Sequence, residues 1–473
     1  GCLGEAPTVG PVLEAMAACR LLTSVGFKLG TPQDQGLDAE VLAEHRDRIR
    51  FHHERGVFPG FAEAAVANGQ LVYWNLCGHT DKSKSYRMSA RTLFRGYSMM
   101  KPITATAFMT LVDDKSVGLH DPVHWYIRSF KDLKVRKKNG QGVEALRKPM
   151  TLCHLLMHTS GIGYGPGSIT PGDPLVARSA EEKHYKSVTV RQEKGDISTL
   201  AHLCEELAGL PLLHQPGSDY AYGMSMDVLG RVMELVTGQP LRKIIQSRVL
   251  DPVGMKDTCF MVPRSKLPHL AGYYRLMREK GDSKRWLQRL DGAKRKDSMY
   301  ARGSNAAYTG GVPAAGGLWG AGRSTMLFSL RDVLLFCQML LRGGQSVAGR
   351  RVLKAETVRS LGRDWLRLKR ASDKLNPPGW GSPDVGWSPL GNVERFGAHA
   401  GALYMGGMSY FWMDPRRKVA AAIMTETYWQ VDPLGWKGER DDLDQVLQNA
   451  VAAAQRKRRA AQAVSTANKR PRR

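Results

Sequence analysis

The chain has 473 residues and the composition of a globular protein, with 42% hydrophobic and 24% charged residues. It contains no run of about 18 uncharged apolar residues, so the sequence predicts no membrane span. The seven cysteines are scattered and odd in number, which argues against a disulfide framework or a zinc site. It favours an intracellular, reducing compartment, and the sequence does not distinguish cytoplasm, nucleus and organelle matrix.

The net charge of +25 is unevenly distributed. The segment from Val451 to the end holds eight Lys or Arg and no acid, and residues 131–148 and 270–302 carry net charges of +5 and +6. Basic segments of this kind favour a polyanion or an acidic protein partner. A well-solvated surface without a partner is an equally weighted alternative.

The first 55 residues predict a helical extension. Two helical patterns, "PVLEAMAACRLL" and "DAEVLAEHRDRIRFHHERG", are separated by the breaker-rich "LGTPQDQG". Gly1-Cys2 weakly matches an acylation signal, but Glu5 stands where that signal has Ser or Thr. Two strand patterns follow, "GFAEAAVANG" and "QLVYWNLCG", and the Asn68-Gly69 pair between them is a strong hairpin signal.

The stretch "FRGYSMMKPITATAFMTLVDD" (residues 94–114) places a serine and a lysine at the start of an apolar helix. Side chains three residues apart share one helix face, so the Lys101 amine can approach the Ser98 hydroxyl. The helix dipole favours negative charge on that hydroxyl, and a buried lysine has a lowered pKa and can act as a base. A polar first turn is the structural alternative.

The rest of the chain predicts a mostly helical lobe over roughly residues 121–300, then a glycine-rich crossing, "AAGGLWGAG". The helix "SLRDVLLFCQMLLRGG" is next, and two strand runs then flank a turn at Asp414-Pro415. Strands at both ends of the chain predict one α/β sheet closed by distant segments. We therefore expect an N-terminal helical extension (1–55), a catalytic domain (56–450) and a basic C-terminal tail (451–473).

Several of these motifs, in this order, resemble the serine β-lactamase-like family, which includes class C β-lactamases, penicillin-recognising peptidases and related esterases. They are "TLFRGYSMMKPITATAFMTLVDDKSVGLHDPVHWYI", "MTLCHLLMHTSGIGYG", "PGSDYAYGMSMDVLGRVMELVTGQPL", "LDPVGMKDTCF" and "HAGALYMGGMSYFWMDP". The resemblance covers about residues 56–440. It implies an antiparallel sheet flanked by helices, with the helical lobe inserted, and it implies no cofactor and no metal.

The resemblance also implies roles for single residues. Ser98 is the expected nucleophile, Lys101 its partner, and Tyr222 a phenolate or proton relay. His399 stands where β-lactamases have a lysine, and Gly401 beside it is expected to bind substrate. The backbone N–H groups of Ser98 and Ala402 are the expected oxyanion hole.

The sequence departs from the family pattern at two positions. The family's Tyr-x-Asn reads Tyr222-Gly223-Met224, and His399 replaces a permanent cation with a group that is mostly neutral at pH 7. Both changes weaken recognition of a β-lactam carboxylate.

Structural alternatives remain for several of these residues. Tyr220 is a rival for the tyrosine role, simple packing is an alternative for Tyr222, and a surface position at a hairpin start is one for His399. His158 and Thr159 belong to "MHTSG", which resembles a structural turn of the family, and we place them outside the active site.

Two functions fit the sequence. The first is a serine hydrolase or acyltransferase that acts on a small-molecule ester or amide through an acyl-enzyme on Ser98. The second is a catalytically weak or silent relative that serves as a basic component of a larger assembly, one that includes nucleic acid if the tail binds phosphates. The intact Ser98, Lys101 and Tyr222 favour the first.

Overall fold

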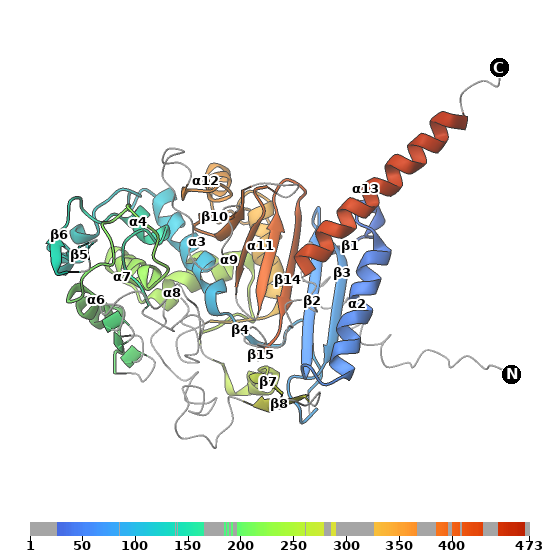
Figure 1. Ribbon diagram of the computed structural model, residues 1–473, viewed down its shortest axis with the longest axis horizontal. Coiled ribbons are helices and arrows are strands. Elements are labelled where there is room, and N and C mark those ends of the chain that lie inside the picture. Colours follow the sequence, from blue (N-terminus) through green and yellow to red (C-terminus); the bar gives the residue numbers. More distant parts are fainter. Residues whose placement is uncertain are drawn as a thin grey trace.

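The computed structural model describes residues 26–84, 86–137, 139, 141–164, 184–185, 187–188, 191–192, 196–260, 262–278, 285–289, 326–366, 385–395, 400–406, 409–428 and 443–468. Two sequence-based expectations, the helix before residue 26 and the glycine-rich crossing at 314–322, lie outside these residues. Figure 1 shows a central sheet with helices on both sides and the inserted lobe at one end.

The central sheet has eight strands in the order β1-β3-β2-β14-β13-β12-β11-β10 among the described residues. All neighbouring pairs are antiparallel except β1 with β3. The strands are β1 (Lys28–Leu29), β2 (Gly60–Ala67), β3 (Gln70–Gly78), β10 (Val385–Ser388), β11 (Gly391–Glu394), β12 (Leu403–Gly406), β13 (Tyr410–Asp414) and β14 (Val419–Met424). The sheet joins strands from both ends of the chain, which confirms the predicted fold class.

The predicted hairpins are present. Asn68 and Gly69 connect β2 to β3 with φ angles of 49° and 81°, the left-handed values that a two-residue hairpin turn requires. The turn at Asp414-Pro415 connects β13 to β14. The segment before that turn was predicted as one strand run, but it forms two, because β12 ends at Gly406, where φ is 153°, and pairs back on β13.

Helices cover both faces of the sheet. On one face lie α3 (Met100–Asp113) and α11 (Leu330–Leu341), and on the other lie α2 (Ala39–Glu54) and α13 (Leu443–Asn468). Buried alanines on β2 and β14 let α11 pack closely on the sheet. Residues 451–468, predicted as the first part of the tail, continue helix α13 away from the body (Figure 1).

The region predicted as a helical lobe contains helices and also strands that the sequence analysis did not predict. The helices are α4 (Leu152–Leu156), α6 (Leu200–Ala208), α7 (Ser225–Thr237), α8 (Leu241–Ile245) and α9 (Asp251–Val253), with a π-helical turn at Gln246–Leu250. The strands are β5 (Lys134–Arg136), β6 (Val143–Ala145), β7 (Tyr274–Arg278) and β8 (Arg285–Arg289). β7 pairs with β15 (Thr427–Tyr428), so this region is joined to the segment that follows β14.

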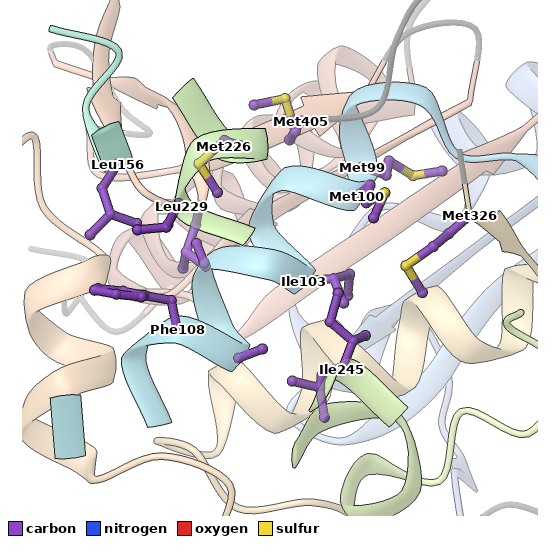
Figure 2. Close-up of a cluster of buried hydrophobic side chains, with 14 of the residues drawn as sticks. Met99, Met100, Ile103, Phe108, Leu156, Met226, Leu229, Ile245, Met326 and Met405 are labelled. Carbon is purple, nitrogen blue, oxygen red and sulfur yellow. The ribbon is translucent and has the colours of Figure 1, made fainter. Parts of the chain in front are cut away.

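A short strand and a 3-10 turn lead into α3. β4 (Phe94–Arg95) pairs with β9 (Leu327–Phe328), and the 3-10 turn η2 (Tyr97–Met99) leads from β4 into α3. Helix α12 (Ala355–Leu361) follows α11. Figure 2 shows the core around α3, where Met99 and Met100 lie in one buried apolar cluster with Met226 of α7 and Met405 of β12.

Candidate active site

Ser98 lies on the turn between β4 and α3. Gly96 packs so tightly that a Cβ atom there would lie 2.0 Å from the Phe328 ring, and its N–H donates to Met326 O at 2.8 Å. Tyr97 has φ of 43°, a left-handed conformation that is uncommon for a bulky residue. This sharp turn places the Ser98 hydroxyl at the N-terminal end of α3, where the helix dipole favours developing negative charge.

Lys101 and Tyr222 both reach the Ser98 hydroxyl. The Lys101 Nζ donates to Ser98 Oγ at 3.2 Å, and the Tyr222 hydroxyl lies 2.7 Å from the same oxygen, with either hydroxyl able to donate. The Lys101 Nζ also lies 4.5 Å from the centroid of the Tyr222 ring. The three groups that the sequence analysis singled out for nucleophilic chemistry are therefore in direct contact.

The surroundings of Lys101 lower the pKa of its amine toward neutral pH. Its side chain is 1% exposed, and burial lowers the pKa of its amine to about 7. The negative charge of Asp227, in the first turn of α7, acts in the opposite direction and raises that pKa. The Lys101 amine and the Asp227 carboxylate are enclosed by the apolar cluster around α3. This cluster excludes the water that would otherwise stabilise the charged form of Lys101.

Tyr222 is held as a neutral phenol. Burial raises the pKa of its hydroxyl well above the usual value of a tyrosine, while the hydrogen bond with Ser98 acts in the lowering direction. Tyr222 is therefore poised to donate a proton at neutral pH.

The rival tyrosine, Tyr220, lies nearby, 6.1 Å from the ring of His158, centroid to centroid. The Tyr220 hydroxyl is buried, and no hydrogen-bond partner is present for it among the described residues. Its ring packs 5.7 Å from that of Trp387, centroid to centroid. The geometry thus favours Tyr222 over Tyr220 for contact with the nucleophile.

The third predicted element is described only in part. His399 lies outside the described residues, whereas Gly401 and Ala402 lie at the turn that enters β12. Gly401 has φ of 91° and its N–H donates to Glu394 O at 2.7 Å. Strand β12 contacts the turn that carries Ser98, so the element is adjacent to the nucleophile, and the oxyanion hole of Ser98 and Ala402 stays a prediction.

Two residues at this site were missed by the sequence analysis. His158, which it placed outside the site, is buried with its ring centroid 4.7 Å from that of Tyr222. Asp227, five residues after Tyr222, is fully buried and acts on Lys101. The sequence signal for Asp227 was an acid within an otherwise apolar helix pattern, whereas no local pattern distinguishes His158 from a structural turn residue.

Within the part of the chain that the structure describes, no group of three or more His, Cys, Asp or Glu side chains is arranged to hold a metal ion. No helix in these ranges is long and apolar enough to cross a membrane.

Comparison with known proteins identifies relatives over most of the chain. A family model described as Beta-lactamase matches residues 43–434. An uncharacterized protein of Mycobacterium tuberculosis is 32% identical over 337 residues, which cover 70% of this chain and 74% of that protein. Esterase EstB of Burkholderia gladioli is 32% identical over 238 residues, or 49% of this chain and 54% of EstB.

Solved structures share the fold. A LovD6 mutant of the simvastatin synthase LovD from Aspergillus terreus superposes with a TM-score of 0.64 at 21% identity, covering 89% of this chain and 99% of that structure. EstCE1, described as a hydrolase with promiscuous acyltransferase activity, has a TM-score of 0.63 at 21% identity, covering 87% of this chain and 98% of its own. These likenesses confirm the β-lactamase/transpeptidase-like fold.

Proposed function

We propose that this chain, which belongs to the β-lactamase family and is an enzyme of the serine-hydrolase type, transfers acyl groups from esters or amides through an acyl-enzyme on Ser98. The observation that carries the proposal is the continuous contact from Lys101 Nζ to Ser98 Oγ to the Tyr222 hydroxyl, at 3.2 and 2.7 Å. A hydroxyl in contact with a buried lysine of lowered pKa and with a phenol is the arrangement of an activated nucleophile.

The proposed acylation begins with the neutral Lys101 amine, which removes the proton of Ser98 Oγ while that oxygen attacks the carbonyl carbon of the substrate. With a pKa of about 7, about half of the lysine is neutral at pH 7. The tetrahedral intermediate then expels the alcohol or amine, which takes a proton from the Tyr222 hydroxyl. The Lys101 ammonium returns a proton to Tyr222, so the enzyme is ready for the second half-reaction.

Deacylation reverses these steps with a new nucleophile. As water or an acceptor alcohol attacks the acyl carbon, its proton passes to Tyr222, whose own proton passes to the neutral Lys101 amine. The bond to Ser98 then breaks, and Ser98 Oγ takes a proton from the Lys101 ammonium. During both half-reactions, we assign the N–H groups of Ser98 and Ala402 to the developing oxyanion, where each donor contributes about 3–4 kcal/mol. Gly401 and His399 are assigned to substrate binding in this proposal.

The chemistry of the site favours simple or flexible acyl esters over β-lactams. Met224 replaces the amide of the family motif, and it is buried and apolar, so it offers no hydrogen bond to a substrate carbonyl. A lost hydrogen bond of this kind costs about 1–3 kcal/mol, or about ten- to a hundredfold in rate. Turnover of p-nitrophenyl butyrate should therefore exceed that of nitrocefin, and equal turnover of the two would contradict this preference.

Covalent labelling tests the proposed function directly. A fluorophosphonate probe should modify the wild-type chain, and mass spectrometry should place the adduct on the peptide that contains Ser98. Ser98→Ala should abolish the label without a change in melting temperature, because one small hydroxyl is lost. Absence of label from several acyl donors between pH 6 and 9 would reject the hydrolase proposal.

A second function is favoured by exposed basic side chains in two regions. Helix α13 projects from the body beyond its contacts with α2 and β14 (Figure 1), and Arg456 on it is exposed. Exposed Lys131, Lys134 and Lys137 give the β5–β6 region the same character. These features support binding of a polyanion such as nucleic acid. Removal of residues 456–473 should reduce retention on heparin at low salt, and unchanged retention would exclude the tail.

A further inference from the structure

His158 makes three separate contacts with the segment that carries Tyr222. Its carbonyl oxygen accepts the N–H of Ala221 at 2.8 Å, and its Nδ1 accepts the N–H of Gly223 at 3.4 Å. Its ring packs against the ring of Tyr222, 4.7 Å from centroid to centroid at an interplanar angle of 41°. One residue thus contacts the position before Tyr222, Tyr222 itself and the position after it.

The local backbone is arranged to make these contacts. His158 has φ of 51°, in the left-handed region, where the turn after α4 directs its ring toward the loop before α7. Gly223 approaches so closely that a Cβ atom there would lie 2.2 Å from Ile162 O. The two loops are also joined by a 2.8 Å hydrogen bond between the hydroxyls of Ser160 and Ser225.

The hydrogen bond from Gly223 also determines the form of the imidazole. Because Nδ1 accepts an N–H, the ring proton of the neutral imidazole is on Nε2. This Nε2 is buried, and no partner is present for it among the described residues. Burial and the nearby Lys101 charge lower the pKa of His158 well below its usual value, so a neutral ring faces Tyr222.

We propose that His158 is a positioning residue that fixes the Tyr222 hydroxyl on Ser98, through its ring contact and its hydrogen bond from Gly223. The proposal rests on the proposed acyl transfer at Ser98. The Tyr222 hydroxyl lies 2.7 Å from Ser98 Oγ and can transfer a proton only while its orientation is held. Small displacements of a reacting group reduce such rates strongly. His158 therefore acts on the reaction through Tyr222 and does not touch the reacting atoms.

A double-mutant cycle with Tyr222 tests this role. His158→Asn retains an acceptor near Nδ1 and tolerates the left-handed backbone, but it lacks the ring, whereas His158→Phe retains a ring and lacks the acceptor. In an otherwise wild-type chain, we expect each substitution to slow fluorophosphonate labelling and ester turnover about tenfold or more, mainly in kcat rather than KM. In a Tyr222→Phe chain, the same substitutions should change the residual labelling rate by less than about twofold, because the hydroxyl that they position is absent.

The controls separate positioning from general destabilisation. His45 is a second buried histidine, bonded to Glu63 at 2.9 Å beneath α2 on the opposite face of the sheet. His45→Asn should lower the melting temperature and leave the labelling rate of the folded protein unchanged. Should the His158 substitutions leave the labelling rate unchanged, or slow it equally with and without the Tyr222 hydroxyl, the positioning role is wrong.

The same experiment distinguishes this proposal from the proposed function. If wild-type protein takes up no label, acyl transfer at Ser98 fails and His158 has no reaction to serve. If wild-type protein is labelled on Ser98 but the cycle is additive, acyl transfer stands and only the role of His158 is rejected.

Discussion

Two groups of buried ionisable side chains in this molecule differ in whether they keep their charge near neutral pH. In the first, burial lowers the pKa of Lys101 to about 7 and Asp227 counteracts it only in part. In the second, Asp257 is also removed from water, but it accepts hydrogen bonds from Arg91, Lys266 and Arg331, at 2.7 to 3.2 Å. Burial opposes ionisation of Asp257 as well, yet the hydrogen bonds from Arg91 and Lys266 hold its pKa below the usual value.

The comparison shows what separates a reactive group from a structural one. Asp257 keeps its charge at neutral pH and links α11, through Arg331, to the segment before β4, through Arg91. The neighbouring Asp332 carboxylate accepts the N–H groups of Asp257 and Thr258 at 2.8 and 2.7 Å, which fixes the same turn. Lys101 loses its charge near neutral pH and is left with a lone pair beside a hydroxyl. Hydrogen bonds from cations let the buried Asp257 keep its charge, whereas burial that Asp227 offsets only in part leaves Lys101 able to lose its proton near neutral pH.

The largest effect should follow from removal of the base. Lys101→Met keeps the volume of the side chain and should reduce fluorophosphonate labelling by about 10³-fold or more, because Lys101 and Ser98 act as one unit. At pH 8 the wild-type amine is mostly neutral, since its pKa is about 7, so the substitution removes little buried charge. The melting temperature at pH 8 should therefore change by no more than a few degrees. Labelling at the wild-type rate would show that Lys101 is not the base.

The second prediction is the reverse of the first, with a large loss of stability and no loss of labelling. Asp257→Ala removes the carboxylate 3.0 Å from Arg331, whose side chain is 8% exposed and keeps only the longer 3.4 Å ion pair with Asp332. This loss should lower the free energy of unfolding by about 3 kcal/mol. At a temperature where the variant is still folded, its labelling rate should match the wild type. Denaturant unfolding and labelling at 15 °C measure the two quantities on one sample, with Asp257→Asn as the volume-matched control. A labelling rate that falls in proportion to stability would remove the distinction between the groups.

The third prediction concerns the acid that partly compensates Lys101. The carboxylate of Asp227 stabilises the ammonium and so raises the pKa of Lys101. Asp227→Asn removes that charge, and the pKa of Lys101 should fall further below about 7. Because the neutral amine is the active form, the acid limb of the pH–rate profile should move to lower pH by about one unit, the small end of the effect of one opposite charge.

The matched control for Asp227 lies after the far end of the helix that carries Lys101. Asp114 is exposed and pairs with Arg248 at 2.7 Å, so Asp114→Asn should leave the midpoint of the pH–rate profile unchanged. A midpoint that stays in place for Asp227→Asn, or that moves upward, would contradict the assigned direction of its charge.

Features that depend on residues close together in the sequence could be predicted from it, whereas contacts between distant positions were harder to predict. The Asn68-Gly69 hairpin and the Ser98–Lys101 spacing are local patterns, and both appear in the structure as predicted. The contact of Tyr222 with Ser98 joins positions 124 residues apart, so it was reached through the ordered family motifs rather than through periodicity. The family match and the shared fold confirm the family and the fold that this reasoning used, and the role of Tyr222 stays a prediction.

Other features depend on packing that no local pattern encodes. His158 reaches Tyr222 because a left-handed residue ends the turn after α4 and a glycine at 223 allows close approach of the two loops. The pairing of β7 with β15 joins two short strands about 150 residues apart. A two-residue strand such as β15 has too few residues to show alternation, and its partner determines its conformation.

The smallest effect on stability should come from an exposed ion pair, because water already stabilises its charges. Lys457 on α13 is 60% exposed and bonds Asp38 and Glu40 at 2.9 and 2.8 Å. Asp38 is the N-cap of α2, and the hydrogen bond from Lys457 lowers its pKa. Because an exposed ion pair contributes little, Lys457→Ala should lower the melting temperature by no more than a few degrees, and less in high salt. Deletion of residues 456–473 should give a similar small fall, since it removes the same ion pair. A fall of more than about 10 °C for the deletion alone would show that the projecting part of α13 belongs to the folded core.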